Sequence, residues 1–349
     1  MYQDRVRLYK ELETEFNGKL LLYVTSDRPN MSAKIAPDVI DYFINQLDRI
    51  GVCKRILLYL YTRGGDTAAA WNIVNLLKMY GDELVVIVPH KAHSAGTIIS
   101  LGANSIIMTK QATLSPIDPS IVTSLNPILP DTKEPYPVSV EAVNGYLDFA
   151  REELKIDNQE ILAKIFMKLT DSVQPLVLGE VYRSRAQIKM LAKRLLKNQK
   201  LNEEEIQKVV EFLCSESGSH DYTINRREAR NELKLQIENP TDEQYKTIKA
   251  IYDDLNEELQ LGTTFNPLEI NGAYAARRSL LESILGGADY FVTEGVVNRM
   301  KSANGEDLFQ NMIVFQGWRH DATKPEEQAL KVGTEKGSVE YETSEEFQL

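Results

Sequence analysis

The chain has 349 residues, a length that exceeds one ordinary domain and suits two. Hydrophobic residues make up 43% of it and charged residues 26%, which is typical of a globular protein and excludes a disordered one. The formal net charge is −11 at pH 7. The chain as a whole therefore does not attract nucleic acid or an anionic membrane surface, and we expect neither as a partner.

The rest of the composition bears on the compartment and on cofactors. Cys53 and Cys214 lie far apart and form no metal-ligand or redox spacing, which fits a reducing compartment. No apolar signal-peptide core follows Met1, and the most apolar stretch, 84–103, is interrupted by a proline, a lysine and two histidines. We therefore predict a cytoplasmic protein with no integral membrane segment. No nicotinamide motif is present, and we expect no metal and no cofactor.

Strands and helices alternate through the first 120 residues. Apolar runs predict strands at 20–24, 56–61, 84–88 and 105–108. Helical periodicity or helix-forming composition separates them at 35–50, 67–79 and 94–103. Continuous apolar strands between helices predict an α/β fold with a parallel sheet covered on both faces.

The second half is predicted to be more helical. After a proline-rich loop, helices are expected over 140–214, with breaks near Asp157 and Pro175. The basic stretch 180–200 fits nucleic-acid binding or the solvated face of an amphipathic helix, and we favour the helix face. Beyond Pro240 we expect helices at 243–259 and 273–285, then short strands at 290–297 and 312–315. The predicted domains are 1–239, a small C-terminal α+β domain or extension at 240–321, and a mobile tail at 322–349.

Three polar loops follow successive predicted strands. They are Thr62-Arg63-Gly64-Gly65, Ala92-His93-Ser94-Ala95-Gly96 and Ser115-Pro116-Ile117-Asp118-Pro119. Because the carboxyl ends of parallel strands meet at one edge of a sheet, where ligands bind, we expect these loops to share one cleft.

Ser94 is the candidate nucleophile. It stands at a strand-to-helix turn among small residues, as acyl transfer requires of a hydroxyl beside backbone N–H groups that stabilise an oxyanion. The alternative is a serine that only caps the following helix. Gly64 and Gly65 either offer an N–H beside the attacked carbonyl or form a plain tight turn.

A serine nucleophile needs a base, and the chain contains four histidines. His220, which precedes a predicted strand, is the preferred candidate, with Asp118 as the carboxylate that orients its ring. His93 adjoins Ser94 in sequence, so its side chain is expected to point away, and His320 lies near the tail. The alternatives for His220 and Asp118 are ordinary turn and capping roles.

At these residues the chain resembles the serine dehydrogenase proteinase family, relatives of signal peptide peptidase A and of the Clp protease proteolytic subunits. The matching segments are 60–65, similar to a T-P-G-G turn; 89–97, close to P-H-x-A-x-S-x-G-T; 115–119, like G-P-[VI]-D-P; and 219–224, like T-H-D-Y-P-I. The resemblance implies a Clp/crotonase-like fold of stacked βαβ units with a long helical insertion. It also implies that Ser94 is the nucleophile and that N–H groups of Gly64, Gly65 and Ala95 form the oxyanion hole.

The chain departs from the family pattern in ways that bear on substrate and base. Arg63 replaces a proline, which loosens the turn and adds a charge at the cleft. Clp subunits use histidine and aspartate, whereas signal peptide peptidases use lysine. Asp118 falls near the position of the Clp histidine, and His220 falls near the loop that bears the Clp aspartate. Exchanged roles and an intervening lysine such as Lys189 both remain open.

The predicted function is hydrolysis of a peptide or protein substrate through an acyl-enzyme on Ser94. The alternatives are a catalytically silent scaffold or partner-binding module and, on the same fold, a crotonase-like acyl-CoA enzyme. The helices over 140–214 carry more apolar positions than a small sheet can cover, and related folds associate through such helices. We therefore expect a closed homo-oligomer.

Overall fold

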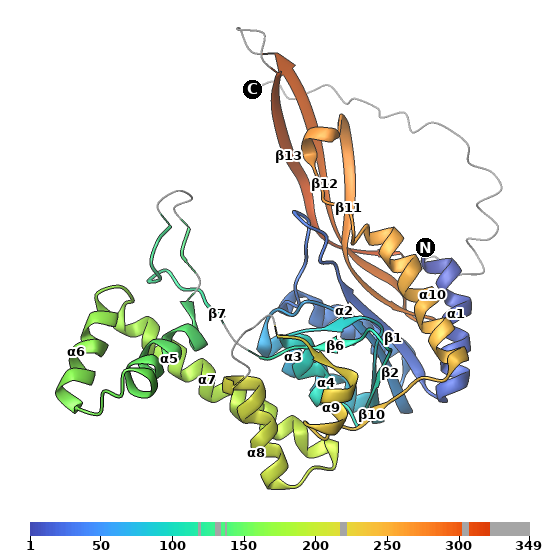
Figure 1. Ribbon diagram of the computed structural model, residues 1–349. Coiled ribbons are helices and arrows are strands. Elements are labelled where there is room, and N and C mark those ends of the chain that lie inside the picture. Colours follow the sequence, from blue (N-terminus) through green and yellow to red (C-terminus); the bar gives the residue numbers. More distant parts are fainter. Residues whose placement is uncertain (118–119, 130–133, 137, 217–221, 302–306, 322–349) are drawn as a thin grey trace.

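The structure is a computed structural model that describes residues 1–117, 120–129, 134–136, 138–216, 222–301 and 307–321. An eight-stranded sheet forms its centre, in the order β10-β5-β3-β2-β1-β11-β12-β13 (Figure 1). The strands are β1 (Lys19–Thr25), β2 (Cys53–Tyr61), β3 (Gly81–Val88), β5 (Ser105–Met108), β10 (Ile237–Glu238), β11 (Gly272–Ser283), β12 (Gly287–Lys301) and β13 (Asp307–Asp321). The first five run parallel, and β11, β12 and β13 continue the sheet antiparallel.

Two small sheets and a set of helices complete the fold. The short strands are β4 (Lys91–Ala92), β6 (Thr113–Leu114) and β9 (Ile224–Asn225) in one sheet, and β7 (Ser120–Ile121) with β8 (Val138–Ser139) in the other. The helices are α1 (Tyr2–Phe16), α2 (Ile40–Ile50), α3 (Thr67–Tyr80), α4 (Ala95–Leu101), α5 (Val140–Asp148), α6 (Gln159–Thr170), α7 (Pro175–Leu196), α8 (Glu203–Glu211), α9 (Arg226–Asn231) and α10 (Asp242–Leu259). Short 3₁₀ turns lie at Pro37–Val39, Lys197–Gln199 and Pro267–Glu269, and π-helical turns at Phe149–Glu153 and Phe212–Glu216.

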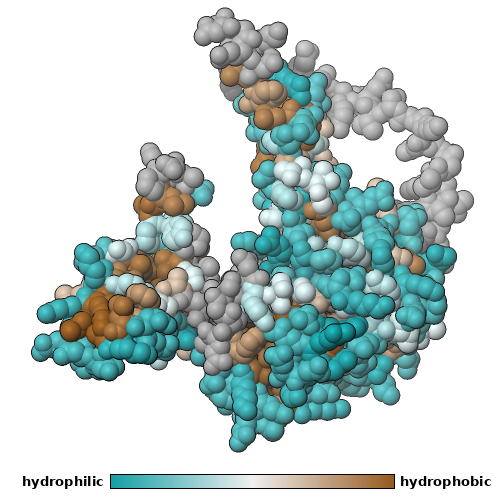
Figure 2. All heavy atoms as spheres, viewed as in Figure 1, coloured by the Kyte–Doolittle hydropathy of each residue, from teal (hydrophilic) through white to brown (hydrophobic). Residues whose placement is uncertain are grey.

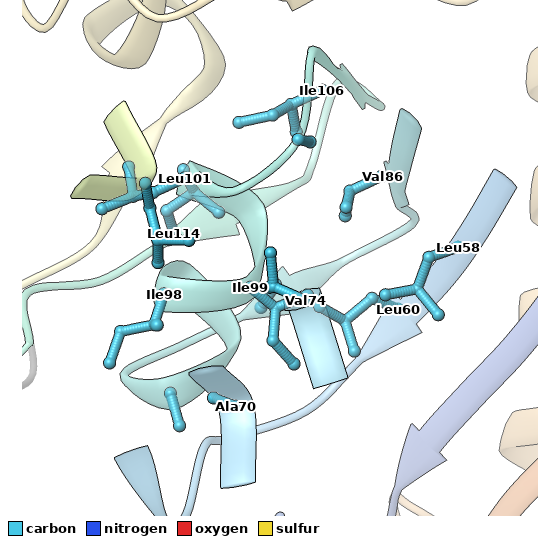
Figure 3. Packing of buried hydrophobic residues seen from close by; sticks show 14 of the residues in the cluster. Leu58, Leu60, Ala70, Val74, Val86, Ile98, Ile99, Leu101, Ile106 and Leu114 are labelled. Atoms are coloured by element: carbon cyan, nitrogen blue, oxygen red, sulfur yellow. The ribbon is translucent and has the colours of Figure 1, made fainter. Parts of the chain in front are cut away.

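The central strands are apolar on both sides because each face of the sheet is covered by helices. Along β2, Leu58 and Leu60 pack toward α2, α3, α4, α7 and α8, whereas Leu57 and Tyr59 pack toward α1 and α10. Figure 3 shows the first of these clusters, in which Ile98 and Ile99 of α4 lie near side chains of α3 and the sheet. Strands buried on both faces read as continuous apolar runs, and this explains the pattern in the sequence.

The predicted α/β fold class is confirmed. The order β1-α2-β2-α3-β3-α4-β5 forms stacked βαβ units, and the predicted helical insertion occupies 140–216. Its breaks lie near Asp157 and Pro175 as predicted, and Leu191 and Leu195 on the apolar face of α7 are buried.

One predicted element is wrong. The helix expected over 273–285 is the strand β11, which pairs antiparallel with both β1 and β12. Its Ala, Arg and Leu residues favour a helix, but the pairing partners on either side decide the outcome. Through β11 the segment expected as a C-terminal extension at 240–321 joins the main sheet. The division at residue 239 remains a prediction, and the tail predicted at 322–349 lies outside the described residues.

Two parts of the molecule project from the body (Figure 1). One is a helical arm, residues 138–182, built by α5, α6 and the first turns of α7. The other is a blade formed by the outer parts of β11, β12 and β13. In the part of the chain that the structure describes, no helix is both long and apolar enough to cross a membrane.

Candidate active site

Ser94 adopts a backbone conformation that few residues other than glycine take. It precedes α4 with φ 52° and ψ −113°, and its side chain makes no capping hydrogen bond to the helix. A helix-capping role is therefore not what holds this serine in place. Among the described residues its Oγ has no hydrogen-bond partner, and the side chain is partly exposed. A strained turn that presents a free hydroxyl is the arrangement of a nucleophile elbow.

The glycine turn lies directly against Ser94. A Cβ atom built on Gly64, whose φ is 110°, would stand 2.7 Å from Ser94 Cβ and 2.9 Å from the carbonyl oxygen of His93. A Cβ atom on Gly96 would stand 2.5 Å from Thr62 Cγ2. Each loop therefore needs a glycine where the other approaches, which explains why small residues occur in both.

The third loop also reaches Ser94. Ser115 Oγ accepts a hydrogen bond of 2.8 Å from Ser94 N–H, and Thr97 Oγ1 donates to the carbonyl of Ser115 at 2.8 Å. The three loops therefore meet at Ser94, as the strand order predicts, and a shared ligand cleft remains a prediction. Asp118 and His220 lie outside the described residues. The chain that follows His220 is placed, however, because Ile224 pairs with Leu114 in the small sheet β4-β6-β9.

The three predicted oxyanion donors differ in their hydrogen bonding. The N–H of Gly64 donates to Thr62 Oγ1 at 2.9 Å and is therefore engaged. Within the described residues, the N–H groups of Gly65 and Ala95 have no acceptor. The nitrogen of Ala95 stands 3.2 Å from the position that a Cβ atom on Gly64 would take, so it faces the glycine turn. Gly65 and Ala95 thus keep free N–H groups in the described part of the chain, whereas the N–H of Gly64 does not.

Two basic side chains near Ser94 in sequence have hydrogen-bond partners, whereas the buried Nδ1 of His90 has none among the described residues. His93 Nε2 lies 2.9 Å from Thr113 Oγ1, and the Lys91 ammonium donates to Asp27 at 2.8 Å. His320 pairs with Asp289 at 2.7 Å on the last two strands, and Lys189 lines a groove on α7.

Sequence patterns did not reveal the ion pair of Asp27 and Lys91. Its residues lie at the carboxyl ends of two strands, beside Tyr61, whose hydroxyl donates to Asp27 at 2.8 Å. Burial alone would raise the pKa of the Asp27 carboxyl, but the hydrogen bond and charge of Lys91 together with the Tyr61 hydroxyl hold it below its ordinary value. In the described residues no cluster of three or more His, Cys, Asp or Glu side chains is placed to hold a metal ion.

Comparisons with known proteins agree with this geometry. Residues 50–135, which hold the glycine turn, the Ser94 turn and the third loop, match the family described as ClpP-like SDH-type serine proteinases. The uncharacterized protein MJ0137 of Methanocaldococcus jannaschii is 34% identical over 200 residues, which are 57% of this chain and 59% of that protein. The uncharacterized protein MJ1495 of the same organism is 42% identical over 64 residues, 18% of this chain and 22% of that protein. The chain thus spans about three fifths of the first relative and about a fifth of the second.

Solved structures with a similar arrangement include two proteases. A mutant of the 1510-N membrane-bound stomatin-specific protease, in complex with a substrate peptide, has a TM-score of 0.36 and 16% identity over 65% of this chain and 78% of that one. The ClpP protease catalytic domain from Plasmodium falciparum has a TM-score of 0.32 and 14% identity over 67% of this chain and 92% of that one. The likeness to a protease family depends on the sequence match, which covers residues 50–135 of the chain.

Proposed function

We propose that this protein is a serine peptidase that cleaves peptide bonds through an acyl-enzyme on Ser94. The observation that carries the proposal is the strained, uncapped Ser94 lying against Gly64, with the N–H of the adjoining Ala95 free within the described residues. The family match over residues 50–135 supports the same chemistry. The substrate is a peptide or protein, and the protein acts in the cytoplasm.

The proposed mechanism follows from this arrangement. Ser94 Oγ attacks the scissile carbonyl as a base takes its proton, and the resulting oxyanion is stabilised by the N–H groups of Gly65 and Ala95, with Gly64 completing the turn. Collapse of the tetrahedral intermediate breaks the C–N bond, and the leaving amine takes a proton from the protonated base. Water then attacks the acyl-enzyme and releases Ser94.

As the base we propose His220, oriented by Asp118, because a histidine titrates near neutral pH and the chain after His220 runs beside Leu114 in the small sheet. Lys91 is an unsuitable base as it stands, since its ammonium is held by Asp27. A lysine elsewhere, such as Lys189, is the rival. His220→Ala should lower hydrolysis strongly, whereas a lysine base predicts that Lys189→Met does so.

The helical arm supports the proposal of a homo-oligomer. None of the side chains of α6 is buried, and Ile161, Phe166 and Met167 on it are exposed. Hydrophobic side chains gather on the arm in Figure 2. An apolar surface of this kind marks an interaction site.

The test of the function is hydrolysis by the full chain and by its Ser94→Ala variant. With a casein or quenched-peptide substrate, Ser94→Ala should lower the rate by about 10³-fold or more, on the scale seen for catalytic triads. Ser124→Ala, which changes an exposed serine on another loop, should leave the rate unchanged. Equal hydrolysis by wild type and Ser94→Ala would refute the proposal.

A further inference from the structure

Two exposed cationic side chains flank the glycine turn that faces Ser94. Arg63 immediately precedes Gly64, and its side chain is exposed. Lys34 is also exposed, between Ala33 and the buried Ile35.

Backbone hydrogen bonds hold the Lys34 segment against the same turn. The N–H of Ile35 donates to the carbonyl of Gly64 at 2.9 Å, and the carbonyl of Ile35 accepts from Asp66 N–H at 2.7 Å. A Cβ atom on Gly65 would stand 2.2 Å from the carbonyl oxygen of Ile35. Arg63 adjoins Gly64, and Lys34 adjoins Ile35, which is hydrogen-bonded to Gly64. Both cations therefore lie one residue from the backbone at the turn that contacts Ser94.

These two cations are not neutralised within the described part of the chain. No hydrogen bond or ion pair there involves the guanidinium of Arg63 or the ammonium of Lys34. The nearby carboxylates serve other partners. Asp66 caps α3 by accepting from Ala69 N–H at 2.6 Å, and Asp27 holds Lys91. Arg63 and Lys34 thus place two cations with no ion-pair partner among the described residues beside the single capping carboxylate of Asp66, on a chain whose net charge is −11.

We infer that Arg63 and Lys34 select peptides that carry Asp or Glu within about two residues of the scissile bond. The inference rests on the proposed function, because it assigns a substrate class to that same site. A guanidinium pairs with a carboxylate through parallel N–H···O bonds, and an ammonium adds a second positive charge. A peptide drawn across the glycine turn brings its own side chains past both.

The experiment compares two peptides that differ only in a Glu or a Gln beside the cleaved bond. The cleaved bond is first located by mass spectrometry of a digested peptide library. The measured quantity is the Glu-to-Gln ratio of kcat/KM for the wild type, Arg63→Gln, Lys34→Gln and the double variant. Each single substitution should lower the ratio about two- to fivefold, as expected for partly exposed charge pairs. The double variant should bring it close to one, and 0.5 M NaCl should shrink the wild-type preference.

Arg7→Gln provides the matched control, because Arg7 is an exposed arginine on α1. It should leave the ratio unchanged. A merely structural role of Arg63 would change both peptides equally and leave the ratio where it was. An unchanged ratio in Arg63→Gln and in the double variant overturns the inference.

A second readout separates this inference from the proposed function. Fluorescence anisotropy measures binding of the same two peptides to Ser94→Ala and to Ser94→Ala combined with Arg63→Gln and Lys34→Gln. If Ser94→Ala binds the Glu peptide more tightly than the Gln peptide, and the combined variant does not, the inference is supported. This holds even where the wild type hydrolyses neither peptide, because the lack of hydrolysis would refute only the proposed peptidase activity. Equal binding of both peptides to Ser94→Ala overturns the inference, whatever the hydrolysis assay shows.

Discussion

At the scale of single residues, the contact between Gly64 and Ser94 decides whether the site can form. An added Cβ at Gly64 would lie 2.7 Å from Ser94 Cβ, too close for any real side chain. Gly64→Ala should therefore displace the Ser94 turn and lower hydrolysis at least as strongly as the loss of one oxyanion donor, about 10²-fold. Peptide hydrolysis is the measurement.

Gly51→Ala is the control that distinguishes the effect of backbone strain from that of the steric clash with Ser94. Gly51 also has a positive φ, of 74°, but nothing lies within 4 Å of the position that its Cβ would take. The control should lose some stability and keep its activity. Full activity in Gly64→Ala would contradict the assigned contact.

The conformation of Ser94 makes a separate prediction about stability. A non-glycine residue in such a region costs of order 1–3 kcal/mol, and glycine relieves the steric part of that cost. Ser94→Gly should therefore unfold at a higher temperature than Ser94→Ala, although both lack the hydroxyl. Thermal unfolding followed by circular dichroism compares the two variants. A lower Tm for Ser94→Gly would show that the turn is not strained.

Much of the site could be predicted from the sequence at this scale. Ser94, Gly64 and Gly65 could be identified because each lies in a local sequence pattern that has a direct chemical reason. The meeting of their loops could be predicted from the order of the strands. The bond from Gly64 N–H to Thr62 Oγ1 could not be predicted, since it depends on a side-chain rotation that leaves no mark in the sequence. The roles of Asp118 and His220 remain predictions.

At the scale of elements, a buried charge network joins α1, α10 and β11. Arg5 is fully buried and donates to Glu282 of β11 and to Glu258 of α10, each at 2.6 Å. It also pairs with Asp254, and Tyr9 donates to Glu282 at 2.5 Å. The sequence did not reveal this network because Arg5 lies 249 to 277 residues from the carboxylates with which it pairs.

Removing the cation should destabilise this junction strongly. Arg5→Met leaves two buried carboxylates without their main partner, a change that typically costs about 3–5 kcal/mol. Arg7→Met, on the exposed face of the same helix, should change the free energy of unfolding by less than about 0.5 kcal/mol. Urea unfolding at pH 7 measures both. Similar midpoints for the two variants would contradict the structural role of Arg5.

The same network predicts how stability depends on pH. Burial by itself raises the pKa of Glu258, but Arg5 and Arg277 bring it below its ordinary value. A group with a lowered folded-state pKa stabilises the fold above its unfolded pKa, about 4.3 for Glu, and loses that contribution as the pH falls through the folded value. Stability should therefore fall between about pH 5 and pH 3, and Glu258→Gln should flatten that fall. An equally steep fall in Glu258→Gln would assign the acid sensitivity to other groups.

The segment 273–285 was predicted to be a helix and forms the strand β11. Its composition favours a helix, yet β11 forms because β1 presents an open sheet edge to it. Local propensity cannot report a partner as distant in sequence as Thr25 is from Ser279. The strands β1, β2, β3 and β5 and the helices between them form from neighbouring segments and were predictable, whereas α1, which packs on the distant α10, was not predicted.

At the scale of the whole molecule, the helical arm predicts self-association. Its groove, of about 620 Å³, is lined by apolar residues that include Leu147, Phe166 and Tyr182. Light scattering at micromolar concentration should give a mass that is a multiple of the 39.6 kDa chain. Phe166→Asp combined with Leu176→Asp should lower that mass, because each places a charge on the apolar surface.

Val52→Asp is the control for this assembly prediction. Val52 is 81% exposed but lies just before β2, away from the arm, so its substitution should leave the mass unchanged. A monomeric mass of the wild type would contradict the proposed oligomer without bearing on Ser94.

The central claim, that Ser94 is the nucleophile, is tested most directly by labelling with a fluorophosphonate. The probe bonds covalently to an activated serine in a folded site, so intact-protein mass spectrometry of the native full chain should show one added probe. Peptide mapping should locate it at Ser94, and Ser94→Ala or heat-denatured protein should take up none. Labelling at another serine, or no labelling of a folded and assembled wild type, would contradict the account.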